Sequence, residues 1–375
     1  MIIILFLGCK SENHSEKKEE AIEKQIHVEL NPNIHTSHII EMFVWPGEYP
    51  TRPMCFAAQK HFEPFKEHPA IKLSDSLLQN EIFYFDELTE ILLYLEDFPS
   101  TDFKYSLENS PYSERSGIIN EWVKKLSEFY VDANVESFLK ENEEFYNGAI
   151  QEVLNNLPPK DFVNQIERYY RESKLKYTLI PSPEMPTGGA YGYRGIGPYV
   201  YTSNGMLIYQ VISASLPVEK DSISNNYKYF GFDNNEFILR NSYHEFGHAF
   251  VNPILAKKEN EVLLDNYKDL FTPELQKVME EQNYDNWFDC LAEHIVRLGE
   301  IRLAERSGNE KWANELRKHH TEDLNFVFLP EFETKIKEYE RNASYNSFEE
   351  FLPNLLKVLD NFDSNKIKSR INKST

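Results

Sequence analysis

A short β-rich stretch enclosed between helical segments is the feature that most limits how this chain can fold. The stretch starts near Lys174 with the strand-like run LKYTLIP. Further on, Asn204-Gly205 separates PYVYTS from MLIYQVIS, and such a pair between two β-rich runs is typical of a hairpin. From Asn234 onward the pattern is helical nearly to the C-terminus. The sequence therefore predicts a predominantly helical α+β protein with one small, mostly antiparallel sheet.

Amphipathic helices are predicted on the N-terminal side of this sheet. Over Asp86–Asp97, apolar residues recur at i, i+3, i+4 and i+7 and form one stripe: Leu88, Ile91, Leu92 and Leu95. Similar patterns predict helices over Gly117–Tyr130, Asn134–Leu157 and Asp161–Ser173. By contrast, Ile26–Trp45 indicates short β-like and mixed segments.

The N-terminus has the pattern of an export signal. The first eight residues, MIIILFLG, are almost wholly apolar, and a charged run, KSENHSEKKEE, follows Cys9. Leu7, Gly8 and Cys9 resemble the lipobox of bacterial lipoproteins, in which the cysteine becomes the acylated first residue. A basic leader is missing, which a misassigned start codon would explain. We expect a lipid anchor on Cys9 and a solvated tether up to Gln25; the alternative is a disordered, mildly apolar N-terminus.

This anchor predicts a protein attached to a membrane of the bacterial cell envelope, either periplasmic or surface-exposed. Cys55 and Cys290 then remain, and the sequence leaves open whether they pair. No apolar run approaches the roughly 20 residues of a spanning helix. With 40 basic and 61 acidic residues the net charge is −21, so we expect no nucleic-acid partner.

The helical segment after the hairpin contains H-E-x-x-H, as His244-Glu245-Phe246-Gly247-His248. The two histidines are one helical turn apart, so both imidazoles project from one face and can hold one Zn²⁺. Glu245 is rotated about 100° from His244, which suits a base for the bound water rather than a ligand. Asp233, Asn234 and Asn235 offer N-caps, and Pro253 is expected to end the helix. A separate apolar stripe on this helix is predicted to be buried: Leu239, Tyr243, Phe246 and Phe250.

A catalytic zinc ion usually has three protein ligands, so a third ligand is needed. The best candidate lies on a helix predicted from Asp285 to Arg306, and we choose Glu293. Asp289 and His294 are the alternatives, and Asp289 could instead orient a ligating histidine. Glu293 is also four residues before Arg297, so a simple ion pair on a helix is another interpretation.

These residues resemble the gluzincin branch of the zincin metallopeptidases, with HEFGH on one helix and a glutamate on a later one. The chain is also similar to an uncharacterised bacterial family of predicted envelope zincins, known only as a domain of unknown function. The resemblance covers about 174–306 and implies one zinc ion per chain in a zincin-like catalytic domain. It also implies a sheet whose edge strand aligns an extended substrate, for which Met206–Ser213 is the candidate. The resulting division is a leader and tether (1–25), a mainly helical region (26–173), the catalytic domain (174–362) and a polar tail (363–375).

The chain departs from the thermolysin pattern beside the third ligand. In that pattern an Asp four residues after the ligating Glu supports a histidine ligand. In this chain the residue four positions after Glu293 is Arg297. The residue that would stabilise an oxyanion is not settled by the sequence. The candidates are Tyr191, Tyr193, Tyr209, Tyr267, Tyr284 and His294.

The predicted function is zinc-dependent peptide hydrolysis in the cell envelope, by a zinc-bound water with Glu245 as general base. A peptide or protein would be the substrate, and the membrane a partner through Cys9. The alternatives are a non-catalytic zincin-like lipoprotein that binds a ligand or protein partner, and a helical scaffold without metal. The remaining histidine pairs, His35 with His38 and His319 with His320, are expected at the surface and not as ligands.

Overall fold

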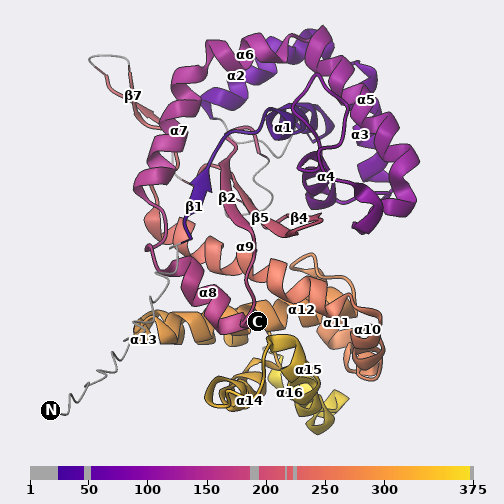
Figure 1. The fold of residues 1–375 in the computed structure, drawn as a ribbon, viewed down its shortest axis with the longest axis vertical. Helices are drawn as coiled ribbons and strands as arrows, with labels where there is room; N and C mark the ends of the chain where they lie inside the picture. Colours follow the sequence, from indigo (N-terminus) through magenta and orange to yellow (C-terminus); the bar gives the residue numbers. More distant parts are fainter. Residues whose placement is uncertain (1–23, 46–51, 186–193, 216–217, 223–225, 372–375) are drawn as a thin grey trace, which may run out of the picture.

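A computed structural model describes residues 24–45, 52–185, 194–215, 218–222 and 226–371. The predicted lipidation site Cys9 and nearly all of the predicted tether lie outside these residues. Helices predominate, as the sequence predicts, and they surround a small sheet (Figure 1). No helix in the described part of the chain is long and apolar enough to cross a membrane.

The central sheet has five strands and is mixed. The strands are β1 (Ile26–Val28), β2 (Lys176–Pro181), β3 (Gly195–Ile196), β4 (Tyr199–Thr202) and β5 (Gly205–Ile212). The predicted hairpin is confirmed, because β4 pairs antiparallel with β5 and Thr202 lies opposite Gly205. However, β1, β2 and β5 run parallel to one another, so the sheet is not mostly antiparallel. Local sequence signals reveal a tight hairpin but not parallel pairing between distant segments.

The predicted edge position of Met206–Ser213 is wrong. β5 lies inside the sheet, with β2 on one side and β3 and β4 on the other. The edge next to β5 is therefore formed by β3 and β4, which both pair with it. A second, two-stranded sheet, β6 (Glu219–Lys220) with β7 (Tyr227–Tyr229), stands apart from the central one.

The two faces of the central sheet belong to different hydrophobic cores. Along β5, Met206 and Ile208 pack into the core of the C-terminal helices, whereas Tyr209 and Val211 pack into the core of the N-terminal helices. This alternation follows from the period of two in a strand. In Figure 1 the N-terminal helices curve around α1 on one side of the sheet, and α9, α12 and α13 lie on the other.

The N-terminal helices are α1 (Pro32–Val44), α2 (Pro53–Phe62), α3 (Pro69–Gln79), α4 (Phe85–Leu92), α5 (Ser116–Asp132), α6 (Val135–Glu141) and α7 (Glu143–Asn155). Those packed on the other face are α8 (Phe162–Tyr170), α9 (Asn235–Leu255), α10 (Lys258–Asp265), α11 (Pro273–Glu280), α12 (Trp287–Arg306), α13 (Glu310–Lys318), α14 (Leu329–Arg341), α15 (Phe348–Leu356) and α16 (Ser364–Arg370). The segment predicted as a polar tail thus contains the helix α16.

Helix α1 corrects the prediction of short mixed segments over Ile26–Trp45. After β1, the side chain of Asn31 accepts hydrogen bonds from the N–H groups of Asn33 and Ile34 and starts a 13-residue helix. Every residue from 33 to 42 is buried, so the helix lacks the amphipathic stripe by which surface helices are found. His35 and His38 are therefore core residues, 1% and 0% exposed, and their predicted surface location is wrong.

Other helix boundaries differ from the predictions in small ways. α4 ends at Leu92 and not near Asp97, and the segment predicted as one helix over Asn134–Leu157 is divided into α6 and α7. Pro253 lies inside α9, which continues to Leu255. A proline here has no N–H to donate to the carbonyl of Ala249, four residues earlier, so the helix continues with one backbone hydrogen bond missing.

Candidate metal centre

The histidine pair lies in the middle of α9. The side chain of Asn234 accepts a hydrogen bond from the N–H of Phe237 and starts this helix, as predicted. Tyr243, Phe246 and Phe250 are buried in the core below, which leaves His244 and His248 on the opposite, half-buried face. The Nε2 atoms of the two imidazoles are 3.2 Å apart.

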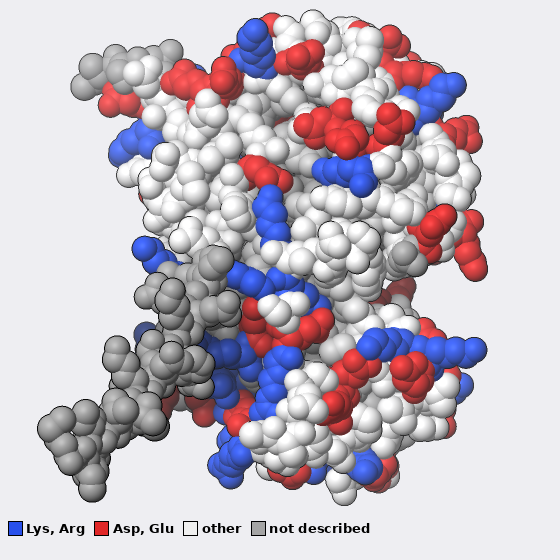
Figure 2. Space-filling model, viewed as in Figure 1, with Lys and Arg blue, Asp and Glu red and all other residues white. Residues whose placement is uncertain are grey.

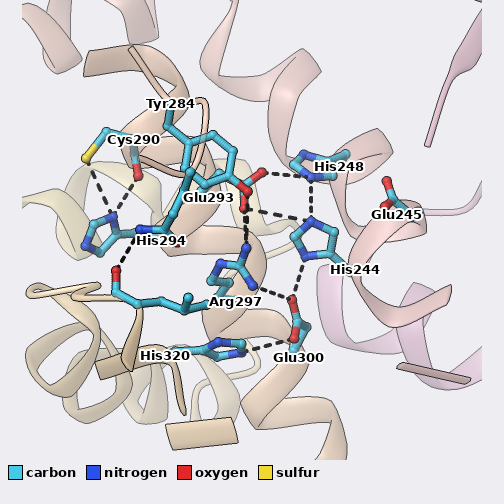
Figure 3. A network of polar contacts seen from close by, with 12 residues as sticks. His244, Glu245, His248, Tyr284, Cys290, Glu293, His294, Arg297, Glu300 and His320 are labelled. Atoms are coloured by element: carbon cyan, nitrogen blue, oxygen red, sulfur yellow. Dashed lines mark hydrogen bonds and ion pairs between the residues drawn. The ribbon is translucent and has the colours of Figure 1, made fainter. Parts of the chain in front are cut away.

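Helix α12 brings Glu293 to the histidines. Its Oε1 atom lies 3.2 Å from Nε2 of His248, and its Oε2 atom lies 3.8 Å from Nε2 of His244. The two helices pack closely at Gly247, where a Cβ atom would lie 3.3 Å from Cγ1 of Val296 on α12. The structure therefore brings Glu293 to two histidines that lie 45 and 49 positions earlier in the chain, through the contact of α9 with α12 (Figure 3).

These donors fit a zinc ion. Two ligand atoms at 2.0–2.1 Å from a tetrahedrally coordinated ion lie about 3.3 Å apart, which is close to the spacing of the His and Glu atoms. Oε2 of Glu293 is buried, and the guanidinium of Arg297 lies 3.3 Å from it. Two imidazoles and a carboxylate are also the donor set of known catalytic zinc sites. The group His244, Glu245 and His248 is compact as well, with its ligand atoms within 4.8 Å of one another.

Glu300, two turns after Glu293 on α12, supports His244 from behind. Its Oε1 atom lies 2.6 Å from Nδ1 of His244, so the imidazole can donate to the carboxylate and keep Nε2 free for a metal. The other oxygen lies 3.1 Å from Nε2 of His320, which is only 2% exposed. For His248, Oδ1 of Asn252 lies 3.3 Å from Nδ1.

Sequence reasoning missed Glu300, His320 and Asn252. The spacing i, i+7 from Glu293 to Glu300 was a usable signal, since such residues share a helix face. Asn252 follows His248 by one turn in the same way. His320 was expected at the surface because no local pattern shows that its π-helical turn, His319–Asp323, folds back onto α12. The predicted exposure of His320 is wrong, whereas His319 is exposed as predicted.

Arg297 lies between the two carboxylates. Its guanidinium is 3.3 Å from Oε2 of Glu293, 3.9 Å from Oε1 of Glu300, and donates to the hydroxyl of Tyr284 at 3.2 Å. The predicted ion pair with Glu293 therefore coexists with the approach of Glu293 to the histidines. Asp289 lies one turn before Glu293. Its carboxylate accepts a hydrogen bond from Nδ2 of Asn286 at 2.7 Å, and its N–H donates to Oδ1 of Asn286 at 2.9 Å.

The charges of the cluster shift the pKa values of its members. Burial alone raises the pKa of Glu293, but the charges of His244, Arg297 and His248 outweigh burial and hold that pKa below its ordinary value. Burial likewise opposes the charged form of His248, yet Glu293 raises the pKa of that imidazole to about 9. Glu293 is thus held as a carboxylate, the form that binds a metal.

Glu245 lies beside the histidines, across them from Glu293 (Figure 3). Its Oε1 atom accepts a hydrogen bond from Nδ2 of Asn241 at 3.0 Å. Oδ1 of Asn241 accepts from Gln210 on β5 at 2.9 Å, and Gln210 accepts from Ser242 at 2.7 Å. The carboxylate of Glu245 is therefore oriented by a chain of amides anchored in the sheet.

The structure places four of the six residues considered for oxyanion stabilisation; Tyr191 and Tyr193 lie outside the described residues. Tyr209 is buried in the N-terminal core, and Tyr267 donates to Asp360 at 3.0 Å. His294 is fully buried among phenylalanines, with Nδ1 at 2.7 Å from the carbonyl of Cys290. Tyr284 alone among these four lies at the cluster, through Arg297. Cys55 and Cys290 are both buried and unpaired.

A family model described as "Domain of unknown function (DUF4932)" matches residues 42–358 of the chain. The match begins near the end of α1 and covers α2 to α7 as well as α8 to α15, so both groups of helices belong to the same family unit as the candidate metal centre. No curated protein and no solved structure matches the chain.

Proposed function

The chain belongs to the DUF4932 family, a domain of unknown function, and from the geometry of its site we propose that it is a zinc-dependent metallopeptidase of the gluzincin type. The observation that carries the proposal is the convergence of His244, His248 and Glu293. Three donor atoms from two helices are spaced as a tetrahedral zinc ion requires, with Glu245 beside them.

His244, His248 and Glu293 would hold the ion and leave a fourth position open. When bound, zinc lowers the pKa of a coordinated water from 15.7 to about 7 and polarises a carbonyl oxygen. Glu245 is 7% exposed, and Asn241 occupies one of its oxygens. The other oxygen can take the proton of the attacking water and pass it to the leaving amine, so that water is added across the peptide bond.

We further propose that the protein works in the bacterial cell envelope, attached to a membrane by a lipid on Cys9. This part of the proposal rests on the sequence at the N-terminus alone. Peptides or proteins in the envelope are the expected substrates. On the face seen in Figure 2, acidic and basic side chains are interspersed, with no broad basic surface that would favour a nucleic acid.

Zinc content and hydrolysis together test the proposal. We expect near one zinc per chain by elemental analysis of the purified protein, and its loss in His248→Ala. Glu245→Gln should keep the zinc but abolish cleavage of a peptide library followed by mass spectrometry. The absence of zinc after loading at neutral pH would overturn the metal site. Zinc without any hydrolysis in the natural protein would favour a non-catalytic zincin-like lipoprotein.

A further inference from the structure

The edge of the sheet beside the metal centre is one continuous run, from Arg194 to Thr202. β3 and β4 keep the same register against β5, since Ile196 pairs with Val211 and Tyr199 with Ile208. The N–H of Tyr209 on β5 donates to the carbonyl of Pro198, and the N–H of Ser213, directly after β5, donates to the carbonyl of Arg194. Even-numbered residues of the edge therefore bond inward to β5, and in an antiparallel pair the odd-numbered ones direct their N–H and C=O groups outward.

Helix α4 and the residues that directly follow it cover one half of this outward edge. The N–H of Tyr199 donates to Oε2 of Glu90 at 3.0 Å, and the N–H of Tyr201 donates to the hydroxyl of Tyr94 at 3.1 Å. Glu90 is 7% exposed and is held in turn by the hydroxyl of Tyr112 at 2.9 Å. An extended peptide cannot pair with the edge at Tyr199 and Tyr201, because both outward donors are already bonded.

The other half of the edge is uncovered by the described residues. No hydrogen bond joins the outward groups of Gly195 and Gly197 to another residue in the described part of the chain, and both glycines are only half-buried. They lie directly on the active-site helix. A Cβ atom on Gly195 would be 1.9 Å from Oδ1 of Asn241, and one on Gly197 would be 2.2 Å from the carbonyl oxygen of Glu245.

The metal centre lies where the uncovered half ends. Gly195 lies at Asn241 and Gly197 lies at Glu245, so two residues of the edge span about the same length as four residues of α9. Along the helix axis, His244 and His248 therefore lie beside Gly197 and the residue after it. Beyond Gly197, the residues on the same face of the edge are no longer glycines. They are Tyr199 and Tyr201, whose rings pack against the C-terminal core. Within the described residues, the outward edge is thus free of hydrogen-bond partners at Gly195 and Gly197 and bonded at Tyr199 and Tyr201.

This inference rests on the proposed function: we propose that the site binds the amino end of a peptide and releases one or two residues from that end. A substrate strand that pairs antiparallel with the edge runs opposite to the chain direction of Gly195–Tyr201. Its carboxyl-side residues lie along Gly197 and Gly195, and its amino end faces the covered half beside α4. Only a short amino-terminal portion fits before the scissile bond, so the N-terminal helices make the protein an aminopeptidase or dipeptidyl peptidase.

Cleavage mapping tests the proposal. A pool of synthetic peptides of about 12 residues, roughly 40 Å when extended, is incubated with the full, zinc-loaded protein and followed by mass spectrometry. We expect stepwise loss of one or two residues from free amino ends. When four residues are added at the amino end, the added residues should be removed first, with no direct cleavage at the original bonds. Internal cleavage, or trimming from the carboxyl end, would overturn this proposal and leave the metallopeptidase standing.

Binding provides a readout that does not depend on turnover. The same peptide pool is attached to beads through either its carboxyl or its amino end, and zinc-loaded Glu245→Gln protein is passed over both. We expect about tenfold stronger retention where amino ends are free. Equal retention on both beads would contradict the claim that the edge at Tyr199 and Tyr201 is closed to the peptide. No cleavage in the natural protein, together with no retention on either bead, would overturn the proposed function and this inference with it.

Discussion

Glu300 lies 2.6 Å from Nδ1 of His244, although 56 residues separate the two along the chain. The carboxylate also contacts His320, so it links one proposed zinc ligand to a turn that packs behind α12. A carboxylate in this position fixes both the tautomer and the orientation of a ligating imidazole. Glu300 therefore supports the candidate metal centre in the role that the thermolysin pattern gives to an Asp at the position of Arg297.

Replacing that support should weaken the metal site without destroying it. We expect Glu300→Gln to lower zinc affinity about 10–100-fold, because the imidazole of His244 loses its charged partner. Competition with a chromophoric chelator measures the affinity. Glu310→Gln, an exposed glutamate on α13, is the matched control and should bind zinc as the natural protein does. Equal affinity in both variants would argue against the role of Glu300.

Asn241 should matter for hydrolysis and not for metal binding. In Asn241→Ala the carboxylate of Glu245 loses the amide that fixes it, and a misplaced base costs about 10–100-fold in kcat. KM and zinc content should stay near those of the natural protein. Asn235→Ala, at the exposed start of the same helix, is the control. A fall in zinc content equal to the fall in kcat would contradict a role through Glu245.

Glycine at position 197 is required by the close approach of the edge strand to α9. We expect Gly197→Ala to lower the free energy of unfolding by about 1–3 kcal/mol, because the added Cβ would meet the backbone of Glu245. Urea unfolding of the zinc-free protein measures the change. Gly117→Ala is the comparison, since nothing lies within 4 Å of a Cβ there. If both variants were equally stable, the strand would have room to move away from the helix.

Glu41 on α1 should make stability depend on pH. Burial raises the pKa of this carboxyl to about 8 from an ordinary value of 4.5, although the hydroxyl of Ser37 and the charge of Arg194 lower it. The folded state therefore holds a proton that the unfolded state has lost. The stabilisation is complete below pH 4.5 and disappears as the pH rises to about 8, a loss on the order of a few kcal/mol.

Glu41→Gln keeps the size and the hydrogen bond from Ser37 but cannot titrate. Between pH 5 and about 8.5, the difference in free energy of unfolding between the variant and the natural protein should grow in favour of the variant. Denaturant unfolding with a chelator present removes the contribution of metal binding. A constant difference across this range would mean that Glu41 is already charged in the folded protein.

Local patterns in the sequence determined the elements that carry the site. The Asn204-Gly205 hairpin, the cap at Asn234 and the one-turn spacing of the two histidines are all short-range features, and the structure forms each of them. The same periodic reasoning selected Glu293 on α12, and this residue does lie against the histidines. Whether these residues bind zinc and hydrolyse peptides stays a prediction.

Only the tertiary structure decided how those elements meet. Parallel pairing of β2 with β5 joins segments with no local signal for each other, and it moves β5 from the predicted edge to the inside of the sheet. Burial on all sides removed the amphipathic pattern of α1 and hid its histidines from sequence reasoning. The contact of Glu300 with His244 and the covering of the edge strand at Tyr199 and Tyr201 both join segments that are distant in the sequence. Periodicity predicts the face of a helix or strand on which a residue lies, but only tertiary packing determines which element that face contacts.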